Sequence, residues 1–416
     1  MWKRWRIRIL LFLAVLGPGF ITANVDNDSG GILTYSQAGA QYGYSLLWTI
    51  IPITIALIVV QEMCARMGVV TGKGLSDLIR EEFGLRLTFV LMLLLVFVNY
   101  TNVVTEFIGI AGSLHLFHVT KFISVPLCAL LVWFMVVKGN YKSTEKIFLV
   151  ASVVYIAYIF AGVLSQPSWS QALHATIQLP GRSVWHDKAY IYMAIGIVGT
   201  TIAPWMQFYL QSSIVEKGIR VKDYGASRLD VIVGSFFTDI VAWFIIVACA
   251  ATLFVHGMGA IQVAADAAEA MRPLAGDYAF LLFAFGLFNA SLFAASILPL
   301  STAYTVCEGL GFESGVDKSF KEAPTFYWLY TLLIAGGAVT VLMLPDAQLI
   351  NFAILSQVLN GVLLPVVIIL MLMLINRQDL MGKHRNSHVW NVVAWSTSII
   401  VIGMTGVMLW GMIPGH

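Results

Sequence analysis

The first apolar run of the chain is broken in its middle by the polar sequence Ala23-Asn24-Val25-Asp26-Asn27-Asp28-Ser29-Gly30-Gly31. Two carboxylates, two amides and a glycine pair thus lie where a continuous helix would cross a bilayer. The sixth apolar run is also interrupted, and reads Gly196-Ile197-Val198-Gly199-Thr200-Thr201-Ile202-Ala203-Pro204-Trp205. Pro204 lacks an N–H and clashes with the preceding turn, so the helix must kink or unwind there. Carbonyl groups freed at this depth persist only where they line a cavity or bind a ligand.

The positions of the two breaks indicate an inverted repeat. They fall in the first and sixth runs, which is the spacing of a five-plus-five arrangement, and five helices place the second half in the opposite orientation. Paired interruptions at matching positions indicate the binding site of a transporter. We therefore expect one all-α polytopic membrane domain over 1–416, with repeats at about 9–167 and 188–376 and an extra helix at about 391–412.

The composition requires lipid as the solvent. Hydrophobic residues make up 59% of the 416 residues and charged residues only 11%, whereas soluble domains have roughly 25% charged residues. A spanning helix needs about 20 apolar residues. Eleven runs meet this requirement, at about 9–43, 46–70, 88–112, 121–138, 146–165, 189–215, 229–255, 278–305, 325–344, 348–375 and 391–412.

The distribution of lysine and arginine predicts the orientation. If the N-terminus is cytoplasmic, the inside segments hold 20 of these residues and the outside segments hold 4. Such an excess marks the cytoplasmic side. An odd number of helices then leaves the C-terminus outside. We expect a multi-pass protein of the cell membrane.

Acids in the middle of a span are costly and usually functional. The candidates are Asp26, Asp28, Glu62, Glu106 and Asp239. Glu62 has Arg66 one turn later, which favours a structural ion pair. Asp28 lies at the break itself, and a carboxylate beside free backbone oxygens is typical of a hard-cation site. An amino-acid substrate stays open, because a helix N-terminus can balance its carboxylate.

Several motifs resemble the Nramp metal transporters along nearly the whole chain. The matching segments are Gly17-Pro18-Gly19-Phe20, Thr34-Tyr35-Ser36-Gln37-Ala38-Gly39-Ala40, Ala65-Arg66-Met67-Gly68-Val69-Val70-Thr71-Gly72-Lys73, Glu106-Phe107, Glu308-Gly309, Ser356-Gln357, and Asn376-Arg377 with Leu380-Met381-Gly382. This resemblance implies a LeuT-type fold of ten core helices plus one, and transport by alternating access.

The departures from the family pattern resemble the Nramp-related magnesium transporters, a divergent branch. Gly31 stands where the family has a liganding Asn, and Ala203 stands where it has a metal-binding Met. Trp205 replaces a His implicated in proton movement, and Val103 replaces an acid three residues before Glu106. The Asn and Met replacements are expected to enlarge the site.

The remaining candidate ligands all offer oxygen, which Mg²⁺ prefers, whereas a thioether favours softer metals. We expect a site made by Asp28, the backbone near Val25, Thr200 and Ala203, the Thr200 hydroxyl and Gln357, with Gly31 opening the space. Mg²⁺ keeps several waters when bound, so a roomy site suits a partly hydrated Mg²⁺ and also admits Mn²⁺.

Proton coupling is not expected, because none of the eight histidines falls inside a predicted span. An ion or proton path would involve Glu106, Asp239, Asp26 and Trp205. The alternatives are a proton-coupled Mn²⁺/Fe²⁺ transporter of the Nramp type and, less favoured, an amino-acid transporter of the same fold. The chain has no HExxH motif, and we expect no enzyme activity and no cofactor. The expected partners are the transported ion and the bilayer, with no nucleic acid and no obligate protein partner.

Overall fold

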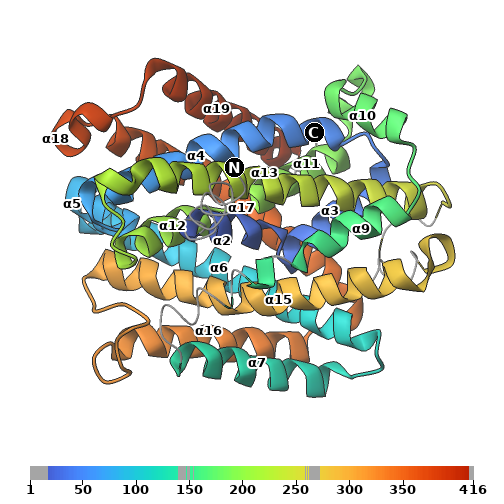
Figure 1. Ribbon diagram of the computed structural model, residues 1–416, viewed down its shortest axis with the longest axis horizontal. Helices are drawn as coiled ribbons and strands as arrows, with labels where there is room; N and C mark the ends of the chain where they lie inside the picture. Colours follow the sequence, from blue (N-terminus) through green and yellow to red (C-terminus); the bar gives the residue numbers. More distant parts are fainter. Residues whose placement is uncertain are drawn as a thin grey trace, which may run out of the picture.

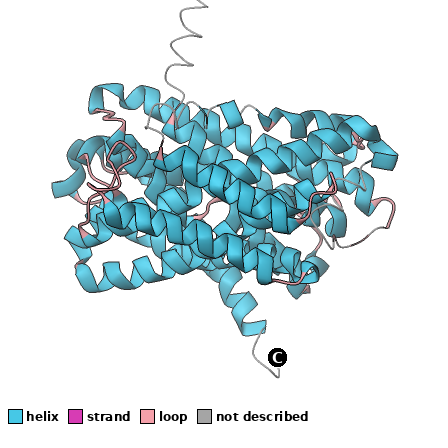
Figure 2. Cartoon of the chain, turned by 90° about the horizontal axis from the view of Figure 1, so that it is seen from below, coloured by secondary structure: helices cyan, strands magenta, loops and turns pink. Residues whose placement is uncertain are grey.

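The computed structural model describes residues 17–138, 154–257 and 272–411, together with residues 147, 150–152, 259 and 261. Within these residues every regular element is a helix (Figure 2). The first run forms α2 (Pro18–Asn24), the short 3-10 turn η1 (Val25–Asn27) and α3 (Ser29–Tyr42). The predicted break in this run is therefore confirmed.

The other helices follow in chain order. They are α4 (Ile50–Thr71), α5 (Leu75–Phe83), α6 (Leu85–His115), α7 (Lys121–Val137), α9 (Ile156–Leu164), α10 (Trp169–Ile177), α11 (Lys188–Thr201), α12 (Pro204–Glu216), α13 (Tyr224–Cys249), α15 (Arg272–Leu310), α16 (Pro324–Met343), α17 (Asp346–Ile375), α18 (Gln378–Met381) and α19 (His388–Gly411). α13 continues into a π-helical turn, η5 (Ala250–Phe254). The sixth run is divided into α11 and α12 at the predicted position.

Each of the eleven predicted apolar runs coincides with at least one described helix. By length and composition, eight helices in the described ranges can cross a membrane, and the bent pair that includes α9 and α10 adds a ninth. The remaining two runs form the 17-residue α7 and the broken α2–η1–α3. Large apolar side chains point outward, as at Phe97 (59% exposed) and Leu130 (67% exposed). Lipid contact explains this surface, because water would disfavour it.

The broken first run lies at the centre of the helical bundle. In Figure 1, α7 and α16 lie side by side along one edge, and α18 and α19 lie along the opposite edge. α2 and α3 pack between α13, α11, α6 and α17. The break is thus surrounded by protein, which is where non-helical backbone is tolerated at membrane depth.

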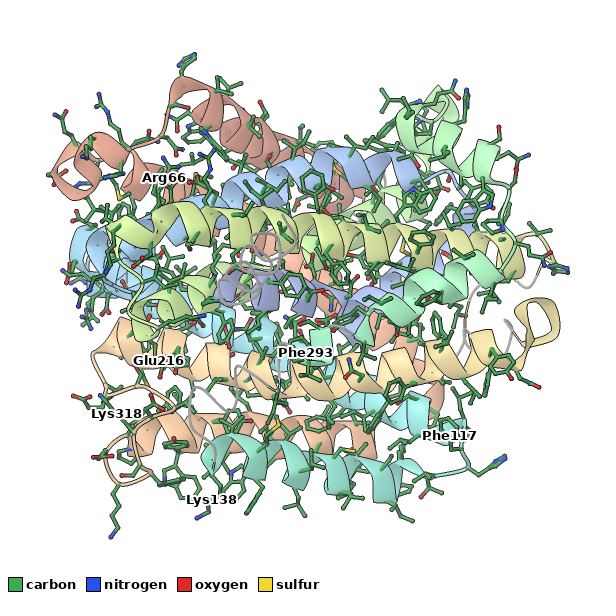
Figure 3. The ribbon with its side chains drawn as sticks, in the orientation of Figure 1. Arg66, Phe117, Lys138, Glu216, Phe293 and Lys318 are labelled. Carbon is green, nitrogen blue, oxygen red and sulfur yellow. The ribbon has the colours of Figure 1, made fainter. Side chains whose placement is uncertain are left out.

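The side chains labelled in Figure 3 include residues near each end of the bundle. Arg66, Glu216 and Lys318 lie toward one end and Phe117 toward the other. Arg66 bonds to Glu62 at 2.9 Å, which confirms the predicted i,i+4 pair. Arg66 also donates to the backbone oxygen of His384 at 3.0 Å. This buried ion pair therefore joins α4 to the segment that leads into α19.

An acid on α13 anchors the first half of the broken helix. Asp230 accepts hydrogen bonds from the backbone N–H groups of Gly17 (3.0 Å), Gly19 (2.8 Å) and Phe20 (3.1 Å). These groups have no partner within the helix because they begin it. The sequence analysis did not single out Asp230, because an acid near a helix start has no distinctive pattern.

A glycine allows α11 to lie directly against α17. At Gly199, a Cβ atom would overlap the carbonyl oxygen of Gln357 and approach the backbone of Gly361. At Gly361, a Cβ atom would lie 2.9 Å from the carbonyl oxygen of Ile195. Small residues that bring backbones together are a common basis of helix association in membranes.

Gly199→Ala should destabilise the folded protein by roughly 1–3 kcal/mol, because an overpacked contact forces the backbone to shift. Gly406→Ala in α19 is the control, since a Cβ atom there meets nothing within 4 Å. Thermal unfolding in detergent should show a lower midpoint for Gly199→Ala than for Gly406→Ala. Equal midpoints would mean that α11 and α17 do not approach each other as described.

Candidate metal site

Asp28 forms the junction between the two halves of the first helix. Its backbone is extended (φ −66°, ψ −179°), which ends η1 and makes Asp28 the N-cap of α3. Its Oδ1 accepts a hydrogen bond from the Gly31 N–H at 2.6 Å. Aspartate is a preferred N-cap residue because its side chain satisfies an unpaired helix N–H. The carboxylate is therefore held at the break and is 3% exposed.

The two glycines after Asp28 are required by close neighbours. At Gly30, a Cβ atom would overlap the Gln357 Nε2 atom. At Gly31, it would overlap the Asp26 carbonyl oxygen and lie 3.0 Å from Thr200 Oγ1. In this conformation the Asp26 backbone and Thr200 occupy the place that a side chain at Gly31 would take, and the expectation that Gly31 enlarges the site stays a prediction.

Glu106 on α6 lies beside Asp28. Its Oε2 accepts a hydrogen bond from the Ser29 N–H at 3.1 Å, and its carboxyl group is within hydrogen-bonding reach of Asp28. Its Oε1 is buried without a partner. No sequence pattern indicates this contact, because 77 residues separate Glu106 from Ser29.

The second break meets the first through Thr200. α11 ends at Thr201, and Ile202 and Ala203 are not helical before α12 begins at Pro204. The Thr200 hydroxyl donates to the Asp26 carbonyl oxygen at 3.4 Å. The Ala203 carbonyl accepts from the Met206 N–H at 3.1 Å, which engages one of its lone pairs. The structure thus brings the two predicted breaks together.

A polar network on α6 and α17 holds Gln357. Asn102 Oδ1 accepts hydrogen bonds from Ser356 Oγ (2.5 Å), Asn360 Nδ2 (3.0 Å) and Gln357 Nε2 (3.5 Å). Asn360 Nδ2 also donates to Gln357 Oε1 at 2.9 Å. In this conformation Gln357 directs its amide nitrogen toward Gly30, so its oxygen must turn inward to reach an ion. Its place among the ligands stays a prediction.

Asp26 and Asp239 form a second pair of acids, which interact electrostatically. All four of their carboxylate oxygens are buried without hydrogen-bond partners. Asp26 lies in η1 and Asp239 on α13. Asn27 joins the same two elements by donating to the Thr238 carbonyl at 3.0 Å. This pair is adjacent to the Asp28 site, because Asp26 lies two residues before Asp28 in the same break, and Asp239 adds an acid from α13.

Other positions near the breaks carry aromatic side chains. Trp205 is fully buried and packs against Tyr209, with ring centroids 6.3 Å apart. Tyr35 shares a hydrogen bond of 2.7 Å with Thr201, which links α3 to α11. Tyr155, just before α9, is buried near Asp28 and Glu106 with an unpartnered hydroxyl. Tyr155 was not among the predicted site residues, because a tyrosine inside an apolar run gives no specific signal.

Oxygen atoms of side chains and of the backbone come together at the two breaks. Within the part of the chain that the structure describes, no three His, Cys, Asp or Glu side chains converge closely enough to hold a metal. Asp28, Glu106 and the Thr200 hydroxyl supply side-chain oxygens, and the interrupted helices supply carbonyl groups. Val25 lies buried at the start of η1, beside these groups.

Comparisons with known proteins agree with this arrangement. The family model described as natural resistance-associated macrophage protein-like (Nramp) matches residues 19–411. Among curated relatives, the divalent metal cation transporter MntH of Deinococcus radiodurans is 26% identical and covers 98% of this chain and 91% of its own. MntH of Ralstonia nicotianae is 28% identical and covers 100% and 93%.

Solved structures support the fold. A manganese transporter of Eremococcus coleocola, crystallised with an aromatic bis-isothiourea substituted compound, has a TM-score of 0.76 at 22% identity and covers 97% of this chain and 89% of its own. MhsT in complex with L-phenylalanine has a TM-score of 0.60 at 13% identity, with 94% and 97% covered. At these identities the likeness concerns the fold alone, and it confirms the predicted LeuT-type architecture.

Gly31→Asn, which introduces the residue that the family pattern has, should distort the break. The new side chain would displace the Asp26 carbonyl and weaken the Gly31–Asp28 cap, at a cost of roughly 1–3 kcal/mol. Thermal unfolding should show the loss, whereas Gly225→Ala, where a Cβ atom meets nothing within 4 Å, should leave the midpoint nearly unchanged. An unchanged midpoint for Gly31→Asn would show that the break has room for a side chain.

Proposed function

This chain belongs to the Nramp family, and on that premise we propose that it imports divalent metal ions, chiefly Mg²⁺ and also Mn²⁺, as partly hydrated ions. The observation that carries the proposal is the position of Asp28, a buried carboxylate at the junction of two broken helices. Two helix ends with a carboxylate between them form a cation site at membrane depth. The relatives named as divalent metal cation transporters support the choice of a metal as substrate.

The preference for Mg²⁺ rests on the groups around Asp28. Asp28, Glu106 and Thr200 offer oxygen, which hard cations prefer. Ala203, at the start of α12, brings no thioether to the second break. An amino-acid substrate is disfavoured, because its carboxylate would face the carboxylates of Asp28 and Glu106.

The transport cycle follows from the same elements. We propose alternating access of two repeats, at about 9–167 and 188–376, around the central breaks, with the N-terminus in the cytoplasm and the C-terminus outside. The Asp230 contacts hold the first half of the broken helix on α13 in this conformation. If α2 moves away from α13, the hydrogen bonds to Asp230 must break, and the N–H groups of α2 must find other acceptors.

Transport without protons is supported by two positions at which this chain lacks the titratable residue of the family pattern, namely Trp205 and Val103. Trp205 is a buried aromatic residue that packs on Tyr209. Val103 is a buried apolar residue that lies against α16 near Gly337. Neither side chain can exchange a proton.

One observation favours the proton-coupled alternative, namely the direct proximity of Glu106 to Asp28. Asp26 and Asp239 are further acids beside Asp28 and Glu106, on the side toward α13. In this proposal they form part of the path of the ion.

Asp28→Asn should reduce Mn²⁺ and Mg²⁺ uptake by proteoliposomes to background, because it removes the charge at the break but keeps the shape and the capping oxygen. Asp346→Asn is the matched control, since Asp346 is an exposed acid paired with Lys121 and should transport normally. Size-exclusion profiles establish that both variants are folded. Normal uptake by Asp28→Asn would remove the proposed site.

Ala203→Met should shift selectivity toward softer ions, because it adds a thioether and reduces the volume of the site. Cd²⁺ uptake should rise relative to Mg²⁺ uptake by about tenfold, equivalent to about 1.4 kcal/mol. Ala203→Leu adds similar bulk without sulfur and should lower Mg²⁺ uptake with no gain for Cd²⁺. If neither variant alters the ratio, position 203 does not face the ion.

Mg²⁺ influx into liposomes should leave the luminal pH unchanged and should increase when the interior is negative. The electrical driving force on a divalent ion is about 4.6 kcal/mol per 100 mV, twice that on a single charge. A pH dye and a Mg²⁺ dye in the same vesicles measure both quantities. Acidification in step with metal influx, and lost in Glu106→Gln, would establish the proton-coupled alternative.

A further inference from the structure

A cavity away from the two breaks opens between α4, α10 and α13. Its volume is about 290 Å³, close to the lower limit of ligand pockets, about 300 Å³. The residues that line it are Ile50, Thr54, Leu173, Phe236, Asp239, Ile240, Trp243 and Phe244. None of them belongs to the broken segments, and Asp239 is the lining residue that interacts electrostatically with the break, through Asp26.

Asp239 is the one acid among these lining residues. It is 2% exposed, and neither carboxylate oxygen makes a hydrogen bond of normal geometry. The neutral Thr54 side chain is the neighbouring hydrogen-bonding group that interacts with it. A buried charge without a partner costs several kcal/mol, so a buried carboxylate is normally paired with a cation or a donor. Asp26, the neighbouring charged group, is itself an acid and cannot serve. Asp239 therefore has no countercharge among the residues that line the cavity.

The face of α13 that carries Asp239 also carries aromatic side chains, and these are held rigidly. Trp243 stacks on Trp169 with centroids 6.3 Å apart and meets Phe244 edge-on at 5.1 Å. Its indole N–H donates to Thr176 Oγ1 at 2.8 Å, which fixes the ring. The faces of aromatic rings attract organic cations, and a fixed ring loses little entropy on binding.

The open side of the cavity faces lipid. Phe236 is 53% exposed, Ile240 46% and Leu173 56%. These apolar side chains would repel a hydrated metal ion or a free amino acid. They would admit a ligand that partitions into the bilayer. The combination of one unpaired carboxylate, aromatic walls and an apolar entrance fits a single ligand class.

We propose that this cavity binds a small hydrophobic organic ammonium from the bilayer, with its ring against Trp243 and Phe236 and its ammonium against Asp239. The Thr54 hydroxyl, also a lining residue, donates to the Ile50 carbonyl at 2.7 Å and keeps a lone pair that can accept from the ammonium. A fused bicyclic ring with a short amine chain suits the volume. A phospholipid head group does not, because its phosphate would lie beside Asp239. The proposal does not depend on which ion the protein transports.

The test is binding of 2-(1-naphthyl)ethylamine to the purified full chain in nanodiscs, measured by calorimetry against empty nanodiscs. The neutral 2-(1-naphthyl)ethanol has nearly the same shape and is the matched control ligand. The amine should bind at least tenfold more tightly than the alcohol after the nanodisc background is subtracted. Equal affinity of the two ligands, or no binding of the amine, would overturn the proposal.

Substitutions test whether the amine binds in this cavity. Asp239→Asn should lower the affinity for the amine at least tenfold, whereas Asp26→Asn, a neighbouring acid outside the cavity lining, should retain the preference for the amine. Leu173→Trp should weaken both ligands, because it fills the cavity. Saturating Mn²⁺ should leave amine binding unchanged. Displacement of the amine by Mn²⁺ would place it at the breaks and refute the cavity site. If Asp239→Asn does not fold, the two ligands and Leu173→Trp decide the question on their own.

Discussion

The structure depends on the satisfaction of helix ends in the middle of a membrane. Water cannot reach the N–H groups at the break, so other parts of the chain must accept their hydrogen bonds. Asp28 accepts from Gly31, and Glu106 accepts from Ser29. Asp230 does the same for the start of α2. Three carboxylates thus stabilise one interrupted helix.

The same constraint explains why the break is suited to cations. Carboxylates that cap helices inside a membrane bring negative charge into a region of low dielectric constant. The interrupted backbone adds carbonyl oxygens that no helix uses. Glycines permit the close approach of α3, α11 and α17, and they leave little empty space around the break. An ion that enters must therefore displace contacts that already exist, such as the one between Thr200 and Asp26.

Two groups of acids coexist in the bundle with different partners. Asp28 and Glu106 are satisfied in part by the N-terminus of α3. Asp26 and Asp239 have no hydrogen-bond partners in this conformation. The first group lies between broken helices and the second lies between η1 and α13. This division separates the acids at the N-terminus of α3 from Asp239, which lines a lipid-facing cavity whose walls are mostly apolar.

The sequence by itself determined the membrane class, the eleven runs, both breaks, the Glu62–Arg66 pair and the family, because hydropathy, glycine, proline and charge act locally along the chain. Only the tertiary structure decided which acids meet. Ser29 is 77 residues from Glu106, and Gly19 is 211 residues from Asp230. Such contacts depend on how helices pack, which no local pattern encodes. The surroundings of Gly31 depend on folding for the same reason, since Thr200, which is distant in the sequence, is brought beside it together with the Asp26 carbonyl.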